Sequence, residues 1–120
     1  MEFNDIYDKD RNLTGRIHKR GTPWHRGEYG LVVCVWVYDG NGNVLLTRRA
    51  PEKSYAGTWE NSGGAAQAGE TSRKAIAREL FEETGIRAGE EEFEFLRTVR
   101  DKNAFYDHYC LKREDRKSVV

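Results

Sequence analysis

The chain has few cysteines and no long apolar run, and each shortage excludes a class of protein. Only two of its 120 residues are cysteines, Cys34 and Cys110, and both lie in apolar stretches that are typical of strands. We therefore expect buried, reduced thiols in a cytoplasmic protein rather than a disulfide framework. No apolar run approaches the ~20 residues that a membrane-spanning helix needs, and the first ten residues lack the character of a signal peptide. We expect no membrane association.

The chain also has no net charge. Its 20 basic and 20 acidic residues cancel to a formal charge of zero at pH 7. No global field attracts nucleic acid or an anionic membrane, so neither is expected as a partner. There is no internal repeat and no low-complexity linker. A length of 120 residues suits one domain with a small core, and we expect that domain to span residues 1–120.

The first thirty residues are polar and rich in turn formers. Short strands are expected at residues 4–7 and 15–18. Basic side chains gather in this region, and they are Arg16, His18, Lys19, Arg20, His25 and Arg26. These side chains either bind substrate phosphates or form a solvated basic surface. The two histidines match no metal-ligand spacing, so surface positions are expected for both.

The strongest strand signal is the run LVVCVWVY at residues 31–38. Its β-branched and aromatic residues predict a central strand that is covered on both faces. The turn at residues 39–43 then predicts a hairpin to a partner strand at 44–49. Further strands are expected at residues 58–60, 93–100 and 104–111. With one helix between them, this order predicts an α/β sandwich with a mixed sheet.

A helix is expected over residues 71–84, between the strands expected at 58–60 and 93–100. Thr71 or Ser72 can cap its start, and Gly85 is placed to end it. One arc of this helix is apolar and is expected to be buried, and it includes Ile76, Leu80 and Phe81. This apolar arc would fix the opposite face of the helix above the core.

The opposite face carries acidic residues at helical spacing. Glu79, Glu82 and Glu83 stand at i, i+3 and i+4, so they share one face of the helix. Like charges this close repel one another unless something positive lies between them. Arg78 is one candidate partner and a divalent cation is another, since Mg²⁺ prefers oxygen ligands. An ordinary solvated acidic face is the alternative that these three glutamates leave open.

The spacing of the whole segment 64–86 decides between these alternatives. The fixed residues are Gly64, Glu70, Arg78-Glu79-Leu80, Glu82-Glu83 and Gly85-Ile86. With this spacing the segment resembles, at every position, the signature (Nudix box) of the Nudix hydrolase superfamily. The resemblance implies a Nudix-type α/β/α sandwich whose loop–helix–loop binds Mg²⁺ or Mn²⁺. It also implies hydrolysis of a small-molecule diphosphate, such as a nucleoside diphosphate linked to another moiety.

The resemblance further implies roles for single residues. The implied metal ligands are Glu79, Glu82, Glu83 and the backbone carbonyl of Gly64, and the implied catalytic residues are Glu79, Glu82 and Arg78. Arg78 would orient the carboxylates, and Glu70 would be a supporting acidic group. Which glutamate takes the proton from the attacking water is not settled by the motif. Outside the motif, Arg48 and Arg49 end a predicted strand, where they either contact the substrate or are solvated at an edge.

Two alternative functions follow from the same resemblance. Residues 7–20 and 25–49 are similar to the branch allied to isopentenyl-diphosphate isomerases, so isomerisation of a prenyl diphosphate is one alternative. Those isomerases use a cysteine and a histidine just after the tryptophan strand, whereas residues 59–66 contain neither, and Gly30 stands where they carry a ligand histidine. The other alternative is a module that binds a nucleotide or diphosphate without turnover. Dependence on Mg²⁺ or Mn²⁺ would separate hydrolysis from simple binding.

The family fold usually continues with a further strand and a C-terminal helix, and the sequence stops about where these would begin. We therefore expect part of the sheet to be left open. Since an open apolar face or an unpaired edge strand tends to associate with another chain, a homo-oligomer is expected. The competing outcome is that residues 1–30 fold back and cover the gap.

Overall fold

The computed structural model describes residues 2–41, 43–45, 47–48 and 59–113. The strands are β1 (Phe3–Tyr7), β2 (Leu13–Lys19), β3 (Gly30–Tyr38), β4 (Val44–Leu45), β5 (Thr47–Arg48), β6 (Trp59–Glu60), β7 (Ser62–Ala65), β8 (Glu94–Asp101) and β9 (Ala104–Lys112). The helices are α1 (Ser72–Thr84) and the short 3₁₀ helix η1 (Glu90–Glu92). The α/β class is confirmed, and the predicted helix and strands are present with one difference. In the predicted partner strand at residues 44–49, β4 pairs with β3 as expected, whereas β5 pairs with β6. Strand β7 and helix η1 are additional.

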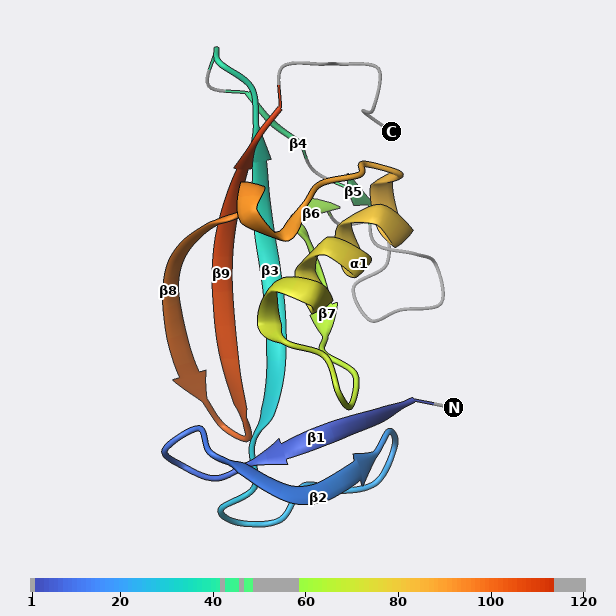
Figure 1. The fold of residues 1–120 in the computed structure, drawn as a ribbon, viewed down its shortest axis with the longest axis vertical. Coiled ribbons are helices and arrows are strands. Elements are labelled where there is room, and N and C mark those ends of the chain that lie inside the picture. The colour runs from blue at the N-terminus through green and yellow to red at the C-terminus, as the bar shows by residue number, and fades with distance from the viewer. Residues whose placement is uncertain (1, 42, 46, 49–58, 114–120) are drawn as a thin grey trace.

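A five-stranded mixed sheet forms the centre of the molecule (Figure 1). Its order is β4-β3-β9-β8, and β7 pairs with β3 on the same side as β4. Strands β3 and β9 are parallel along their whole length, from Gly30 opposite Ala104 to Tyr38 opposite Lys112. The other pairings in this sheet are antiparallel. The predicted mixed sheet with a central third strand is therefore confirmed.

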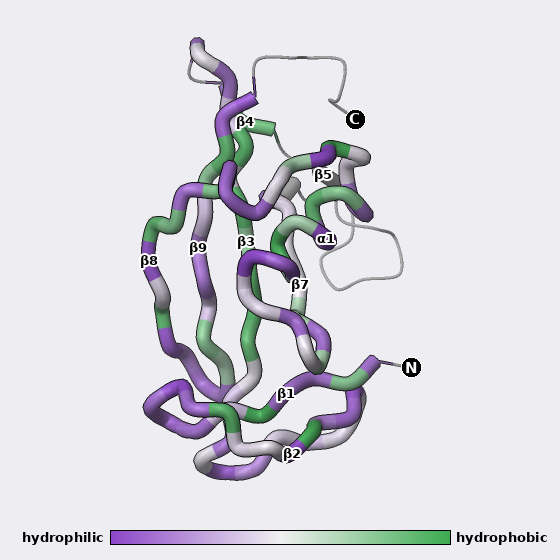
Figure 2. Tube along the Cα trace, viewed as in Figure 1, coloured by the Kyte–Doolittle hydropathy of each residue, from purple (hydrophilic) through white to green (hydrophobic). Residues whose placement is uncertain are grey.

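The hydrophobic core lies between this sheet and α1. Alternate residues of β3 are buried, and Val33 and Val35 have no exposed surface. They meet Ile76 and Leu80 of α1, which are also fully buried. Figure 2 shows β3 as the most continuously apolar strand, with α1 in front of it. Burial of these branched side chains is the main force that fixes the helix on the sheet.

The other face of β3 is only partly covered, which contradicts the expectation of cover on both faces. Trp36 is 43% exposed, and Val32, Cys34 and Tyr38 are intermediate among the described residues. The strand therefore alternates between a buried and a half-open face, as strands with one core-facing side do. Because nearly every residue of β3 is apolar, the sequence does not show this alternation.

The β1–β2 hairpin lies across one end of the sheet (Figure 1). Backbone hydrogen bonds join Tyr7 to Tyr29, and the N–H of Ala68 donates to the carbonyl of Phe3 at 2.8 Å. The buried Asn4 side chain donates to the Ala66 carbonyl at 2.8 Å. These contacts fix the hairpin next to the loop that leads into α1.

The additional strand, β7, brings glycines close to β3. A Cβ on Gly63 would lie 2.3 Å from the Val33 carbonyl oxygen, so only glycine permits this approach. Its sequence, SGGA, has no strand pattern, and the pairing with β3 imposes its conformation. Among the described residues, no helix is long and apolar enough to cross a membrane.

Candidate active site

Helix α1 begins and ends where the sequence predicts. The Thr71 hydroxyl accepts a hydrogen bond from the Lys74 N–H at 3.2 Å, which caps the helix start. Gly85 ends it with a φ of 79°, and its N–H donates to the Phe81 carbonyl at 2.8 Å. The expectation that Phe81 is buried is wrong. Its ring is 41% exposed, and the Arg87 guanidinium lies over it at 4.3 Å.

Arg78 is the centre of the polar contacts around α1. Its Nε and Nη2 donate to the two carboxylate oxygens of Glu70 at 2.6 Å and 2.9 Å, which makes a bidentate pair. Nη2 also donates to the Ala65 carbonyl at 3.2 Å. The hydrogen bonds that Arg78 donates to Glu70 raise the pKa of Arg78 further above its ordinary value. The guanidinium thus connects the helix to β7 and to the loop before the helix.

The supporting carboxylate, Glu70, is held from two sides. Besides Arg78, the backbone N–H of Gln67 donates to it at 2.7 Å. Burial alone would raise the pKa of Glu70, but these hydrogen bonds outweigh it and lower the pKa below its ordinary value. Glu70 is therefore an ionised anchor for Arg78, and its supporting role in the reaction stays a prediction.

The remaining Arg78 nitrogen faces the acidic side of the helix. Its Nη1 lies 3.0 Å from Glu82 and 3.4 Å from Glu79, in each case measured to Oε1. The two carboxylates differ in environment, since the Glu82 side chain is 56% exposed and that of Glu79 only 14%. Arg78 therefore holds one carboxylate at the surface and one in the interior.

Glu79 lies against the backbone of β7. A Cβ on Gly64 would be 2.1 Å from Glu79 Oε2, so the glycine leaves the space that the carboxylate fills. Burial raises the pKa of Glu79 to about 7; Arg78 opposes this shift, and the charges of Glu83 and Glu82 add to it. The site therefore disfavours the ionised form of Glu79 unless a cation lies beside it.

Glu83 lies on the same side of the helix as Glu79. The backbone N–H of Gly63 donates to its Oε1 at 3.1 Å. Glu79 and Glu83, with Gly63 and Gly64, line one part of a cavity of about 570 Å³. Glu82 is not among the residues that line this cavity. Although Glu82 shares the helix face of Glu79 and Glu83, its carboxylate lies outside this cavity and binds Arg78.

The donor set fits a hard divalent cation in part. Across residues 2–41, 43–45, 47–48 and 59–113, no three His, Cys, Asp or Glu side chains converge as a ready cluster. Glu79 and Glu83 supply carboxylate oxygens at the cavity wall, next to Gly64. Mg²⁺ keeps several waters beside one or two carboxylates, so a pair of this kind suffices. Burial, more than the neighbouring carboxylates, raises the pKa of Glu79.

The two arginines predicted to contact the substrate are only partly placed. The backbone of Arg48 lies in β5, opposite Trp59 of β6, and its side chain is outside the described part of the chain. Arg49 lies outside the described residues altogether. Their role stays a prediction.

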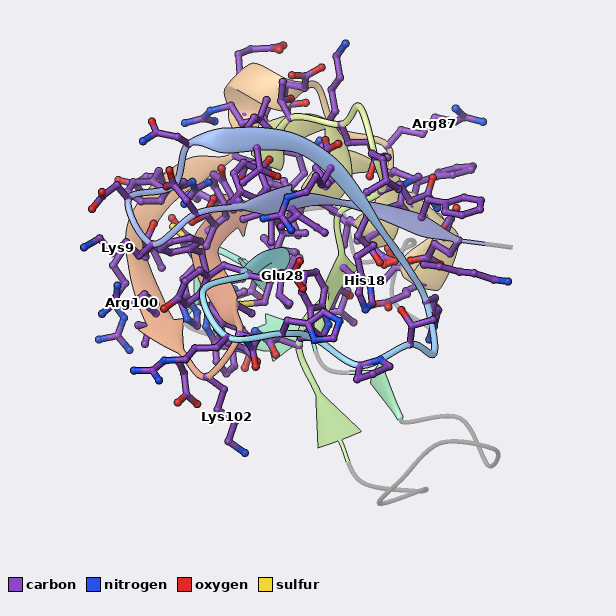
Figure 3. The ribbon with its side chains drawn as sticks, turned by 90° about the horizontal axis from the view of Figure 1, so that it is seen from below. Lys9, His18, Glu28, Arg87, Arg100 and Lys102 are labelled. Atoms are coloured by element: carbon purple, nitrogen blue, oxygen red, sulfur yellow. The ribbon has the colours of Figure 1, made fainter. Side chains whose placement is uncertain are left out.

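His18 was expected at the surface, and this is wrong because it is only 7% exposed. It stacks on Trp24 with 3.7 Å between ring centroids, and both residues line the cavity that holds Glu79 and Glu83. Figure 3 shows His18 within the hairpin end of the molecule, whereas Lys102 points away from it. The spacing of these residues gives no local signal, because the hairpin brings them to the cavity only through its long-range contacts.

The sequence matches the family model of the NUDIX domain over residues 28–119, and the chain belongs to this family. It is 38% identical, over 88 residues, to an uncharacterized Nudix hydrolase of Listeria monocytogenes; the match covers 72% of this chain and 52% of that protein. An isopentenyl-diphosphate Delta-isomerase of Leifsonia xyli is 39% identical over 71 residues, which cover 58% of this chain and 36% of that protein. The chain spans about half the length, or less, of these relatives.

The fold is also similar to solved structures. The crystal structure of DR0079 from Deinococcus radiodurans aligns with a TM-score of 0.77 and 23% sequence identity. The alignment covers 95% of this chain and 74% of that one. At this identity the likeness concerns the fold alone, and it agrees with the Nudix-type α/β architecture predicted from the motif.

Proposed function

We propose that this chain hydrolyses the diphosphate linkage of an organic diphosphate, with Mg²⁺ or Mn²⁺ held by Glu79 and Glu83. The observation that supports this most is the placement of both carboxylates on the wall of one cavity, beside the glycines of β7. Family membership supports the same reaction class. A cytoplasmic location is part of the proposal and agrees with the free thiols of Cys34 and Cys110.

The protein's own residues would act as follows. Arg78, fixed by Glu70, holds Glu79 and Glu82 in place, so the acidic face needs little rearrangement on binding. The bound cation would neutralise the charge of the diphosphate and stabilise the leaving group. A glutamate of this set would accept the proton of the attacking water.

We retain Glu82 as a third ligand and as a catalytic residue in this proposal. Its carboxylate binds Arg78, so ligation requires a new rotamer. At 56% exposure, the side chain has room for that change. The carbonyl of Gly64 stays a proposed ligand as well, because the glycine lines the same cavity.

Replacing Glu83 tests the reaction class. Glu83→Gln should lower hydrolysis at least about a hundredfold while the fold is retained, because a neutral amide is a poor ligand for Mg²⁺. Glu91→Gln is a matched control, since Glu91 is an exposed glutamate of η1. Hydrolysis should be assayed with and without Mg²⁺ on nucleoside triphosphates, dinucleotides, nucleotide sugars, coenzyme A derivatives and prenyl diphosphates. Equal turnover by the parent and Glu83→Gln would contradict the proposal.

The isomerase alternative is disfavoured by the structure around Gly30. A Cβ there would lie 3.0 Å from two ring atoms of Trp24, so the indole fills the place of a side chain. The stretch from Trp59 to Gly69 also contains no cysteine and no histidine. We expect no double-bond migration on isopentenyl diphosphate, and proton exchange measured by NMR would reveal it if it occurred.

A further inference from the structure

We propose that the β1–β2 hairpin completes the active site: Arg20 binds a phosphate oxygen of the substrate, and Glu2 positions the Arg20 guanidinium. This inference rests on the proposed hydrolysis of a diphosphate and adds two residues to that site. Both residues lie before residues 28–119, the part of the chain that matches the family model. The inference also separates Arg20 from the other basic side chains of residues 16–26.

Arg20 is the arginine of this basic group that reaches the cavity. It lines the cavity that also holds the proposed cation ligands. Arg16 does not line the cavity, and its Nη1 donates to the Glu28 carboxylate at 2.6 Å instead. The other lysine and arginine of the group that do not line the cavity are Lys19 and Arg26. The hairpin therefore brings one guanidinium to the proposed site and leaves the others outside.

Glu2 orients this guanidinium. Arg20 Nη1 donates to Glu2 Oε2 at 3.0 Å, and the backbone N–H of Arg20 donates to the Glu2 carbonyl at 3.0 Å. The Glu2 side chain is 25% exposed, whereas that of Arg20 is 71% exposed. In the described part of the chain, Arg20 Nε and Nη2 donate no hydrogen bond. The planar guanidinium is thus held at one nitrogen and keeps donors for a phosphate, whose oxygens it can bind in pairs.

The hairpin has a fixed place next to the loop that leads into α1 (Figure 1). The Phe3 carbonyl accepts a hydrogen bond from the Ala68 N–H at 2.8 Å. The Asp5 carboxylate accepts one from the Gly69 N–H at 2.9 Å. Because these bonds are made by the residues just after Glu2, the pair of Glu2 and Arg20 cannot move freely relative to the cavity. A cation that is placed in this way needs little ordering when a ligand binds.

The charges around the cavity leave a place for this arginine. A diphosphate carries several negative charges, and one divalent cation at Glu79 and Glu83 would offset only part of them. Glu2 and Arg20 line the same cavity of about 570 Å³ as these two carboxylates. Lys102 also lines it, but this lysine points away from the hairpin (Figure 3). A diphosphate held by the cation would therefore take its further positive partner from Arg20.

Binding of methylenediphosphonate, a non-hydrolysable diphosphate, tests the inference without turnover. The affinity is measured by calorimetry with Mg²⁺. Arg20→Gln should weaken it about tenfold, since a hydrogen bond to a charged group accounts for roughly that factor. Arg20→Lys should recover only part of the loss, because an ammonium group cannot bind two phosphate oxygens in a planar fork. On any diphosphate that the parent hydrolyses, Arg20→Gln should raise KM about tenfold and change kcat less.

The positioning role of Glu2 is tested by a double-variant cycle. Glu2→Gln should weaken the binding of methylenediphosphonate about threefold in the parent and not at all in the Arg20→Gln background, because Glu2 acts through Arg20. A merely structural role would give the same loss in both backgrounds and would overturn the positioning role. Tighter binding by Glu2→Gln would also overturn it, since Glu2 would then compete with the phosphate.

Arg16→Gln is the matched control, because Arg16 is an exposed arginine of β2 that pairs with a carboxylate and does not line the cavity. Its affinity for methylenediphosphonate should equal that of the parent. Circular dichroism would confirm that each variant folds, and if Arg20→Gln does not fold, Arg20→Lys still decides. An unchanged affinity in folded Arg20→Gln would overturn the inference, as would an equal loss in Arg16→Gln.

Failure of the inference can be distinguished from failure of the proposed function. Hydrolysis with the same KM in the parent and in Arg20→Gln would keep the hydrolase and overturn the role of Arg20. Binding of methylenediphosphonate that depends on Arg20, without turnover of any diphosphate, would keep the role of Arg20 and overturn the hydrolase.

Discussion

The carboxylate of Glu79 occupies the space that a side chain on Gly64 would fill, with Oε2 placed 2.1 Å from the position of the missing Cβ. A side chain at position 64 would therefore displace the end of the Glu79 side chain. The glycine also determines where the Glu79 carboxylate is held.

Gly64→Ala should lower metal-dependent hydrolysis by more than about tenfold, because the new methyl group displaces the Glu79 carboxylate by more than catalysis tolerates. The double variant Gly64→Ala/Glu79→Asp relieves the overlap and should recover stability but little activity. Hydrolysis rates and denaturant unfolding measured on all members of this cycle would show the coupling. Additive effects on stability would contradict the contact.

Arg78→Lys should weaken both stability and hydrolysis, since an ammonium group cannot reproduce the bidentate contact with Glu70. We expect a loss of about 1–2 kcal/mol in the free energy of unfolding, with allowance for partial solvent screening. The control is Arg113→Lys, which breaks a similar bidentate pair with the more exposed Glu92 and should change stability less and activity not at all. Equal losses in both variants would show that Arg78 has no special role.

The sequence could predict the helix because its signals are local. The period of Ile76 and Leu80, the cap at Thr71 and the stop at Gly85 lie within one segment, and the structure begins and ends α1 accordingly. Phe81 lies at the border of the apolar arc, where an exposed contact with Arg87 competes with burial. Periodicity alone does not resolve such border positions.

Other features depend on long-range contacts, and local pattern could not reveal them. Strand β7 exists because its glycines approach β3 closely, and glycine has no strand preference. His18 is buried because the hairpin folds against the sheet, where Trp24 covers its ring. The pair formed by Arg11 and Asp107 is separated by 96 residues, so neither side chain indicates the other in the sequence.

The Arg11–Asp107 pair should make stability fall in acid. Arg11 donates two hydrogen bonds to the Asp107 carboxylate, at 2.6 Å and 2.5 Å. Burial alone would raise the pKa of Asp107, but the hydrogen bonds from Arg11, Ser72 and Thr98 lower it below its ordinary value. A lowered folded-state pKa stabilises the protein above the unfolded-state pKa of about 4, and this stability is lost as the pH falls through the folded-state value.

Asp107→Asn should therefore lower the free energy of unfolding at pH 7 by about 2–4 kcal/mol, because it leaves Arg11 without its charged partner. The difference from the parent should shrink below about pH 4, as the parent's own carboxyl takes up a proton. Urea unfolding at several pH values measures this. Asp101→Asn, at the exposed end of β8, is the control and should show no such pH dependence. A gap that stays constant with pH would contradict the prediction.

Strand β8 is the basis for the expected self-association. It forms one edge of the main sheet, and Phe95, Leu96 and Val99 on it are 48%, 50% and 38% exposed. An apolar edge strand of this kind tends to pair with another chain. Leu96→Lys should shift the protein toward the monomer in sedimentation at several concentrations. A monomeric parent protein at high concentration would contradict the prediction.

The pKa of Glu79 makes the effect of a cation depend on pH. Since burial raises this pKa to about 7 in the folded protein, and the unfolded value is about 4.5, ionisation of Glu79 opposes folding. The stability that its neutral form contributes is fully present below about pH 4.5 and is lost as the pH rises through 7. Without metal, Glu79→Gln should thus be more stable than the parent at pH 8, by about 1–3 kcal/mol, and equal to it at pH 4.

Mg²⁺ should raise the Tm of the parent at pH 8 and leave that of Glu79→Gln nearly unchanged, because a cation that binds only the folded state stabilises that state. Thermal unfolding with Mg²⁺ or with EDTA gives both results, and an equal rise in Tm for the two proteins would place the cation away from Glu79.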